Sequence, residues 1–426
     1  SDTKQKALKV FMNTFYGELG NKNSPLFILE LAGAITSAGQ KNLLLIKDYV
    51  ERLNHKVYYG DSVTGDTPVL IRENGKDLKL IAIEEYGWNN STNSKNKEFI
   101  NEDNLPEGNP EIYTENGWTP IKKMIRHFTT KKLYKVNTHI GSIIVTEDHS
   151  LINTLGKKIT PNEVNLETEL MHWDKLDTHD QNTKIKFHDI HKKINNLPEN
   201  YSIDELKDTI IFDIAFVYGF FFGDGSCGYY ECESGKKHSF ALNNSNLKYL
   251  DVCLKIFNSY YKYVQLKIYD TLESSHVYKA IANGNVKRIV SEWRDMFYSE
   301  RRYKKVPDII LNADSRTKIA FMQGYYLADG DTNCNRMDNK GQIGSQGLFL
   351  LMDSLGYNVS INIRSDKLEL YRLTFSTNKF IKNVNKIKKI EYIGETEQYV
   401  YDLETESHHF AAGVGKMVVH NTDSLY

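Results

Sequence analysis

Three side chains capable of acyl transfer lie at two distant points of the sequence: Ser62, Asn421 and Thr422. The Ser62 hydroxyl can attack the carbonyl carbon directly before it through a five-membered ring, which converts the Asp61–Ser62 amide into an ester. The Thr422 hydroxyl would then take the upstream chain by attacking that ester. The side-chain nitrogen of Asn421 can attack its own backbone carbonyl, which cleaves the chain before Thr422 and leaves a succinimide.

Candidate groups that assist these steps stand in the segments TEDH and VVHN. The nitrogen-to-oxygen shift is uphill, so it needs a polarised amide and a proton donor for the departing nitrogen. We expect Thr146 to hold the amide or its oxyanion and His149 to protonate the nitrogen. We expect His420 to polarise the Asn421 carbonyl or to protonate the leaving group. Each short motif is common in surface sequence, so the interpretation depends on their order along the chain.

A duplicated pattern indicates a second kind of chemistry. The stretches VYGFFFGDG (217–225) and MQGYYLADG (322–330) each carry small residues four apart in an apolar helix and end in Asp-Gly. Small residues at i and i+4 let two helices approach backbone to backbone. Parallel helices would therefore bring Asp224 and Asp329 side by side, and two adjacent carboxylates favour a divalent metal ion.

The elements that must position these groups change in character along the chain. Residues 31–53 carry apolar residues at helical spacing and predict an amphipathic helix. From about residue 69 short β-rich pieces follow, with a surface loop expected over 89–110. Residues from 174 to about 385 mix helical and strand-like stretches, and short strands return after 386. The simplest interpretation is an all-β domain interrupted by an α+β domain.

The composition excludes several classes of protein. The 54 Lys and Arg against 55 Asp and Glu argue against binding nucleic acid or a membrane by bulk charge alone. Four cysteines are too few for a disulfide framework, which favours a reducing, intracellular compartment. No apolar run reaches the roughly 20 residues needed to cross a bilayer, and the start SDTKQK is no signal peptide. We expect a soluble, intracellular monomer.

The two ends of the chain resemble parts of the family B DNA polymerases. The stretch KVFMNTFYG (9–17) resembles that family's nucleotide-binding helix motif, and deleting residues 62–421 would join YGD to TDS. The resulting YGDTDS resembles the palm turn whose two aspartates hold the catalytic metal ions. Regenerating this motif at one defined cut indicates a polymerase interrupted by an insert. Residues 1–61 and 422–426 are then inactive polymerase fragments, the upstream one mainly helical.

An insert of 360 residues that breaks an active site resembles an intein. SVTGDTPV and the Thr-x-x-His spacing resemble the first two conserved blocks of the Hint fold, and VYDLETESHHFAAG resembles the block before the C-terminal junction. The resemblance implies a functional imidazole at His408 with His409 as its neighbour, an acid at Asp402, and no cofactor for splicing. It also implies a horseshoe-like, all-β Hint domain made of residues 62–173 and 386–421.

The duplicated Asp-Gly pattern resembles the LAGLIDADG homing endonucleases, which cut both strands of a long DNA site with paired, metal-bound carboxylates. The resemblance implies an α+β domain of two pseudo-symmetric halves over residues 174–385. It implies Mg²⁺ held by Asp224 and Asp329, with double-stranded DNA from the uninterrupted polymerase gene as the partner. An antiparallel sheet after each helix would lie in the major groove.

Several alternatives stay open at this point. The helix pair could be purely structural, with capping aspartates, or the endonuclease could be inactive and only bind DNA or stabilise the splicing domain. The splicing domain could cleave without joining, as hedgehog-type domains do, although Thr422 and the restored motif argue against this. The basic residues that could contact phosphates or assist the metal are Arg301, Arg302, Lys304, Lys305, Lys287, Arg288, Arg294 and, as a guess, Lys379.

Overall fold

The computed structural model describes residues 24–25, 62–94, 97–149, 151–174, 176, 185–233, 235–364, 366–380 and 382–421. Residues Gly60–Thr422 form one compact unit. The helix predicted over 31–53, both polymerase motifs, Asp61 and Thr422 lie outside the described residues, so the structure does not test them.

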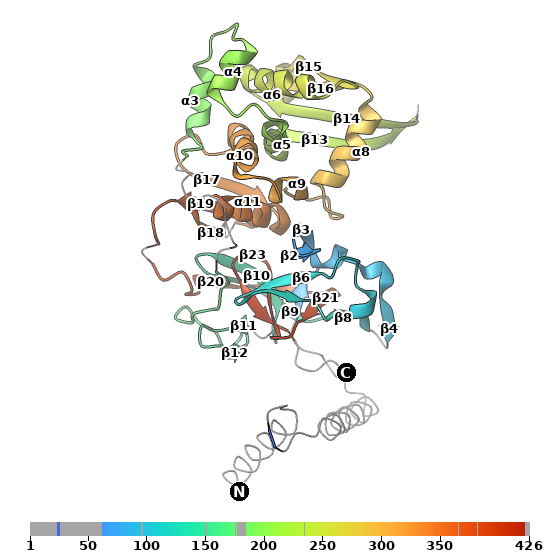
Figure 1. The fold of residues 1–426 in the computed structure, drawn as a ribbon, viewed down its shortest axis with the longest axis vertical. Coiled ribbons are helices and arrows are strands. Elements are labelled where there is room, and N and C mark those ends of the chain that lie inside the picture. The colour runs from blue at the N-terminus through green and yellow to red at the C-terminus, as the bar shows by residue number, and fades with distance from the viewer. Residues whose placement is uncertain are drawn as a thin grey trace. The chain divides into compact units, whose positions relative to one another are not determined.

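A β-rich domain is built from both ends of the described chain (Figure 1). Its strands are β1 (Val63–Thr64), β2 (Pro68–Glu73), β3 (Asp77–Ala82), β4 (Thr92–Ser94), β5 (Lys97–Asn101), β6 (Glu111–Thr114), β7 (Gly117–Pro120), β8 (Lys123–Thr129), β9 (Lys132–Asn137), β10 (Gly141–Thr146), β11 (Leu151–Ile152), β12 (Lys158–Ile159), β20 (Lys389–Glu395), β21 (Gln398–Glu404), β22 (His409–Ala411), β23 (Val414–Gly415) and β24 (Val418–His420). Three short 3-10 helices accompany them: η1 (Ile83–Glu85), η2 (Trp88–Asn90) and η3 (Glu102–Asn104).

The strands of this domain form three antiparallel sheets. Within the described residues, the largest has the order β20-β9-β10-β1-β21-β8-β5-β4, with β23 paired to β10. The others are β12-β11-β24-β22 and β3-β2-β6-β7. Strand β1 lies between β10 and β21, where Val63 pairs with Val145 on one side and with Tyr401 on the other. The first residues after the N-terminal junction are therefore held between strands from both ends of the domain.

The expectation of a plain surface loop over residues 89–110 is wrong in part, because this stretch contains β4, β5 and η3. Strand β5 pairs with β8, and Ile100 is fully buried opposite Met124. These strands lie at one end of the sheet, where few side chains need to be buried, so their polar composition does not indicate strands in the sequence.

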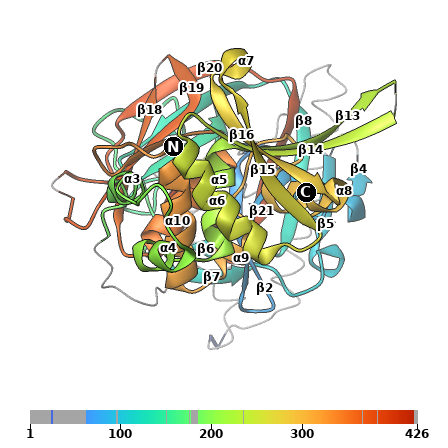
Figure 2. The same cartoon turned by 90° about the horizontal axis from the view of Figure 1, so that it is seen from above.

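An α+β domain occupies the middle of the chain. Its elements are α3 (Asp189–Asn195), α4 (Ile203–Thr209), α5 (Ile214–Asp224), β13 (Gly225–Cys232), β14 (Gly235–Asn244), α6 (Leu247–Tyr260), β15 (Val264–Thr271), α7 (Leu272–Ser275), β16 (Val277–Gly284), α8 (Val286–Phe297), α9 (Asp308–Leu311), α10 (Ser315–Asp329), β17 (Arg336–Lys340), α11 (Gln342–Ser354), β18 (Asn358–Arg364) and β19 (Lys367–Ser376). Helix α5 leads into the antiparallel sheet β13-β14-β16-β15, and α10 leads into β17-β19-β18. Strands β13 and β14 extend as a ribbon beyond their neighbours (Figure 2). The two predicted pseudo-symmetric halves and the predicted fold class are confirmed.

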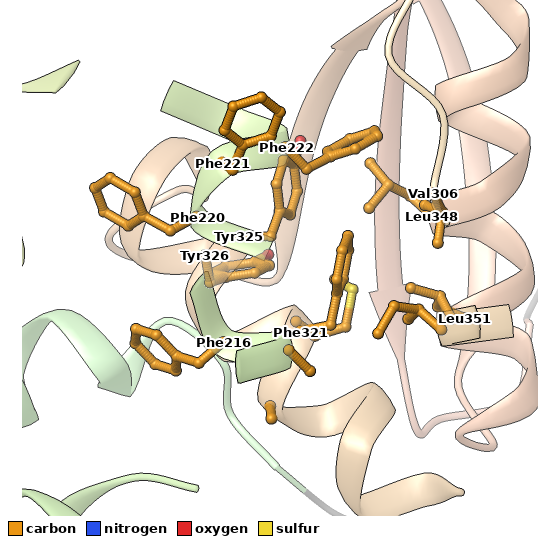
Figure 3. Packing of buried hydrophobic residues seen from close by; sticks show 14 of the residues in the cluster. Phe216, Phe220, Phe221, Phe222, Val306, Phe321, Tyr325, Tyr326, Leu348 and Leu351 are labelled. Carbon is orange, nitrogen blue, oxygen red and sulfur yellow. The ribbon is translucent and has the colours of Figure 1, made fainter. Parts of the chain in front are cut away.

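Helices α5 and α10 pack together where the sequence carries its small residues. A Cβ on Gly219 would overlap the carbonyl oxygen of Phe321, and a Cβ on Gly324 would overlap that of Phe216. Large side chains beside these glycines fill the two halves, and Phe222 lies 5.5 Å from Tyr325 between ring centroids (Figure 3). The spacing of small residues therefore decides how the two halves meet.

Replacing Gly324 with alanine tests this backbone contact. Because the added methyl group would meet a backbone carbonyl, which cannot rotate away, we expect Gly324→Ala to lower the free energy of unfolding by about 3 kcal/mol. Gly228→Ala is the control, since a Cβ there meets only the Arg294 guanidinium at 3.8 Å. Urea unfolding measures both variants. Small and equal changes in the free energy of unfolding of the two variants would show that the helices are not in close contact.

The two domains share buried apolar surface. One apolar cluster lies wholly within the β-rich domain. The other continues from the α+β domain into Leu70, Leu80, Trp173 and Val414 of the β-rich domain. The α+β domain is therefore packed onto the β-rich domain and not merely tethered to it.

Candidate functional site

The N-terminal junction is buried in the centre of the largest sheet. Ser62 is 1% exposed and directly precedes β1. Its carbonyl oxygen accepts hydrogen bonds from the backbone N–H of Thr146 at 3.1 Å and from the Thr146 hydroxyl at 3.4 Å. Thr146 thus holds the carbonyl one residue after the scissile amide, and the amide's own oxygen belongs to Asp61, outside the described residues.

His149 lies in the turn that follows β10. It is fully buried, and neither ring nitrogen has a hydrogen-bond partner within the described part of the chain. The pKa of His149 is lowered to about 3, mainly by burial; Asp148 opposes this shift, and the charges of His420 and Lys131 contribute to it. A neutral imidazole with both nitrogens unoccupied can donate one proton and accept another.

The low pKa of His149 predicts a pH-dependent stability. The unfolded chain binds a proton near pH 6.5 and the folded chain does not until about pH 3. The free energy of unfolding therefore falls as pH decreases through this window, with a slope approaching about 1.4 kcal/mol per pH unit for this group. Urea unfolding between pH 7 and 5 should show a shallower slope for His149→Asn. An unchanged slope would contradict the buried, neutral state.

At the C-terminal junction, the side-chain amide nitrogen of Asn421 adjoins a carbonyl that His420 contacts. Asn421 is fully buried, and no described group hydrogen-bonds to its Nδ2. The Nδ1 atom of His420 contacts the Asn421 backbone oxygen, which is the carbonyl that Nδ2 would attack. The nucleophile, its target and a donor to that target therefore lie within two residues.

His408 holds Asn421 at two points. Its Nδ1 lies 3.1 Å from the side-chain oxygen Oδ1 of Asn421, and its carbonyl oxygen accepts the Asn421 backbone N–H at 2.9 Å. The rings of His408 and His420 stack with centroids 5.9 Å apart. His408 has a φ of 61°, which is a strained conformation for a residue with a Cβ. Of the two neighbouring histidines, His408 is the one that contacts Asn421.

His409 also lies beside His420. The two residues are paired between β22 and β24, with ring centroids 5.4 Å apart. The Nδ1 atom of His409 lies 2.7 Å from Oε1 of Glu115, in the turn between β6 and β7. Burial opposes the charge of Glu115, but the hydrogen bond from His409 holds the pKa of the carboxyl below its usual value. Glu115 is a contact that sequence reasoning missed, because no local motif marks it.

The two junctions meet around His149 and His420. Two residues after His149, Leu151 pairs with Val419 of β24, and the charge of His420 contributes to the pKa of His149. Asp402 is buried on β21, where its Oδ1 accepts the N–H of Leu403. The structure therefore brings Ser62, Thr146, His149, His408, His420 and Asn421 into one region of the β-rich domain, with Asp402 on the strand that borders β1.

A second candidate site lies at the ends of α5 and α10. A Cβ built on Gly223 would lie 3.1 Å from the Cβ of Asp329, so the end of each helix adjoins the other. Burial raises the pKa of both Asp224 and Asp329 to about 6, and the charge of Asp224 adds to the effect on Asp329. Asn244 donates to Oδ2 of Asp224 at 2.6 Å. Two carboxylates at adjoining helix ends offer hard oxygen ligands for a divalent cation.

Lys304 is the basic residue beside these carboxylates. Its Nζ donates to the carbonyl oxygens of Phe221, Phe222, Gly223 and Gly225, at 2.7 to 3.1 Å. It thereby closes the C-terminal end of α5, where a cation is favourable. Burial lowers the pKa of Lys304 to about 8 against the raising effect of both aspartates. Lys379, the guess from sequence, is exposed.

The basic cluster predicted to contact phosphates is divided in the structure. Arg301 forms an ion pair with Glu84 of the β-rich domain, with its Nη2 2.6 Å from Oε2. Lys304 is turned toward α5. In the α8 group, Arg288 pairs with Glu292 at 2.8 Å. These three residues are therefore engaged within the chain and do not form one continuous basic patch.

The composition of the second site is compatible with Mg²⁺ only if other ligands contribute. No group of three or more His, Cys, Asp or Glu side chains able to hold a metal occurs among the described residues. Asp224 and Asp329 would need phosphate or water oxygens to complete six-fold coordination. The donor set is all oxygen, which suits Mg²⁺ better than a softer ion.

Comparison with known families identifies the chain. The family model "Intein splicing domain" matches residues 69–421, which is well over half of the sequence, and the chain belongs to this family. The model "DNA polymerase family B" matches residues 1–82. The predicted combination of an intein with a polymerase fragment is confirmed.

Several relatives are named as DNA polymerases. The chain is 42% identical to a DNA polymerase of Acanthamoeba polyphaga mimivirus, over 99% of this chain and 24% of that protein. It is 24% identical to a DNA polymerase of Thermococcus hydrothermalis, over 97% of this chain and 27% of that protein. The DNA polymerase beta of an African swine fever virus isolate matches 61 residues at 57% identity, or 14% of this chain and 5% of that protein. The chain thus spans about a quarter of the two relatives that match nearly all of it.

Among solved structures, the homing endonuclease I-DmoI in complex with DNA and Mn is similar over 38% of this chain and 88% of that one, with 17% identity and a TM-score of 0.31. The transcription factor IIB Mvu mini-intein is similar over 84% of this chain and all of that one, with 11% identity and a TM-score of 0.30.

Proposed function

We propose that this chain splices itself, excising residues 62–421 and joining Asp61 to Thr422. The observation that carries the proposal is the geometry at Asn421, whose Nδ2 has no hydrogen-bond partner among the described residues and adjoins its own carbonyl, while His420 contacts that carbonyl oxygen. The splicing domain would consist of residues 62–173 and 386–421. Supporting these bounds, Leu170 donates its N–H to Asn385 at 2.9 Å, so the chain leaves and re-enters the domain at one place.

The first step is an acyl shift onto Ser62. The hydroxyl oxygen forms a bond to the Asp61 carbonyl carbon, the carbon–nitrogen bond breaks, and the hydroxyl proton passes to the departing nitrogen. His149 is the group that relays this proton, since it is buried, neutral and without another partner among the described residues. Thr146 holds the Ser62 carbonyl and so fixes the orientation of the residue that attacks.

The last steps take place at Asn421. The Thr422 hydroxyl oxygen attacks the ester carbon, the bond to the Ser62 oxygen breaks, and the Thr422 hydroxyl proton passes to that oxygen. Nδ2 of Asn421 then attacks the Asn421 carbonyl carbon and gives up a proton, which the departing Thr422 nitrogen takes. The bond to the Thr422 nitrogen breaks, with His420 stabilising the oxygen that gains charge. His408 orients the side-chain amide by its hydrogen bond to Oδ1, and Asp402 supports β21 beside the junction. The ester at Thr422 rearranges to the more stable amide, restoring YGDTDS, and no cofactor takes part.

Replacing the first nucleophile separates the steps. We expect Ser62→Ala to abolish ester formation, branching and ligation, a loss of at least about 10³-fold, because alanine has no oxygen to accept the acyl group. Ser142→Ala, at a buried serine of β10, is the control and should splice. Gel electrophoresis and mass spectrometry follow the ligated product of residues 1–61 and 422–426. Ligated product from Ser62→Ala would refute the proposed nucleophile.

We propose a second activity for residues 174–385, site-specific cleavage of double-stranded DNA at the uninterrupted polymerase gene. The supporting observation is the pair of carboxylates, Asp224 and Asp329, at adjoining helix ends, each followed by an antiparallel sheet. Mg²⁺ bound there would polarise a phosphate and activate water. Asp224 and Asp329 would hold the ion, and Lys304 would balance their charge. A monomer suffices, because one chain supplies both carboxylates.

The alternative is an inserted domain that binds DNA or stabilises the splicing domain without cutting. The shared apolar cluster and the ion pair of Arg301 with Glu84 favour a stabilising contribution in either case. The polymerase fragments, residues 1–61 and 422–426, would have no activity by themselves. No helix within the described residues is long and apolar enough to cross a membrane, and we place the protein inside the cell, where the polymerase gene is found.

A further inference from the structure

Helix α11, in the second half of the α+β domain, packs against the β-rich domain. Its residues 342–353 are buried throughout. A Cβ on Gly347 would lie 2.6 Å from Val306 and 3.4 Å from Leu80 of β3. Figure 1 shows α11 on the side of its domain that faces β2, β3 and β23, and α11 contacts all three strands. Helix α11 therefore supports β2, β3 and β23 of the β-rich domain.

One glutamine of α11, Gln346, hydrogen-bonds to both the backbone N–H and the backbone carbonyl of Gly415 in the β-rich domain. Nε2 of Gln346 donates to the carbonyl oxygen of Gly415 at 3.2 Å, and Oε1 accepts the Gly415 N–H at 2.6 Å. Both bonds are buried, so water cannot replace them. Gly415 has a φ of 84°, and a Cβ there would overlap the Ile140 carbonyl oxygen. The turn at Gly415 thus depends on a side chain from the inserted domain.

The next residue is held by the same helix. Nζ of Lys416 lies 2.8 Å from Oδ1 of Asp353, and the side chains are only 11% and 3% exposed. Nζ of Lys416 also lies 4.6 Å from the centroid of the Trp173 ring. The Lys416 backbone N–H donates to Ile140 at 2.9 Å, and its carbonyl accepts the N–H of Trp173 at 3.0 Å. Because a buried charge is costly without its partner, Asp353 fixes where Lys416 can lie.

The segment held by α11 leads directly to the C-terminal junction. It joins β23, which pairs with β10, to β24, which ends at His420. Strand β24 has only three residues, and its pairing with β11 is limited to Val419 opposite Leu151. The position of Asn421 is therefore set by His408, by β22 and by the turn that precedes β24.

We propose that Gln346 and Asp353 are positioning residues for cleavage at Asn421, which makes part of the inserted domain a component of the splicing apparatus. The inference rests on the proposed splicing function. Neither side chain touches the reacting atoms; both act through residues 415 and 416. Attack by Nδ2 on the Asn421 carbonyl requires close alignment, so a small displacement of β24 slows this step. The Ser62 step is little changed, because β10 and β21 hold β1 in place.

The test compares Gln346→Met with Gln342→Met in the full chain. Gln342 lies one turn earlier on α11, is similarly buried (4% against 5% exposed), and its amide has no hydrogen-bond partner among the described residues. In a Ser62→Ala background, mass spectrometry of the loss of residues 422–426 measures cleavage at Asn421 alone. In an Asn421→Ala background, release of residues 1–61 by hydroxylamine measures ester formation alone.

We expect Gln346→Met to slow the loss of residues 422–426 by about tenfold or more relative to Gln342→Met, with ester formation within about twofold. Asp353→Asn should also slow the loss of residues 422–426. Equal rates in the two glutamine variants, or an equal fall in both steps, would overturn the inference, since general destabilisation slows both. If the Ser62→Ala parent releases no residues 422–426 and the Asn421→Ala parent forms no ester while folded, the proposed function itself fails.

Discussion

An Asn421→Ala chain should retain its downstream residues while still moving its upstream chain. Alanine lacks the nitrogen that attacks the backbone carbonyl, so release of residues 422–426 should fall by at least about 10³-fold. Ser62, Thr146 and His149 keep their contacts, because none of the bonds at the N-terminal junction involves the Asn421 side chain. A branched species, with the upstream chain esterified to Thr422, should accumulate.

Hydroxylamine and mass spectrometry distinguish this branched species from the unreacted chain. The two have the same mass, but hydroxylamine cleaves the ester and frees residues 1–61. Asn385→Ala is a suitable control, since the Asn385 side chain bonds to His172 and, among the described residues, to none of the reacting groups, so the variant should splice. Release of residues 422–426 from Asn421→Ala at the parent rate would mean that another group cleaves this bond.

An Asp224→Asn chain should splice normally and fail to cut DNA. The substitution keeps the shape of the side chain and removes one of the two negative charges that would hold Mg²⁺, so cleavage should fall about 10³-fold or more. Splicing should be unchanged, because Asp224 hydrogen-bonds within its own domain, to Asn244 and Asn243. Linearisation of a plasmid that carries the uninterrupted polymerase site, with Mg²⁺, measures the cutting.

Asp213→Asn is the matched control for this experiment. Asp213 caps the other end of α5 by accepting the N–H of Ala215, and asparagine can make the same bond. This variant should cut at the parent rate. Cutting by Asp224→Asn would exclude a metal site at the helix ends. A parent chain that binds the plasmid without cutting it would favour the inactive alternative.

Sequence reasoning succeeded for the fold where chemistry or packing imposes a local pattern. The glycines at 219 and 324 predicted a helix pair in contact, because only small residues allow backbones to approach so closely. The placement of Asn421 beside His420 was predictable because the two are adjacent in the chain. The return of β strands after residue 386 was predictable from alternating apolar residues such as those of β21.

Sequence reasoning failed where a contact joins distant residues without a motif. Lys304 reaches carbonyl groups some 80 positions away, and in sequence it is one member of a basic run. Glu115 hydrogen-bonds to His409, which lies 294 positions away in the sequence, and the sequence around Glu115 indicates only a turn. Gln346 lies within an apolar helix, and only the fold reveals that its amide holds Gly415. Such contacts depend on tertiary packing, which local spacing does not encode.

Intact-mass measurement of the folded, purified chain tests the central claim most directly. Self-excision predicts two new species: residues 62–421 ending in a succinimide, and a ligated remnant of residues 1–61 and 422–426. Both should appear without any added cofactor and at equal rates. Persistence of the full chain of 426 residues, with neither species formed under conditions where the chain is folded, would contradict the account.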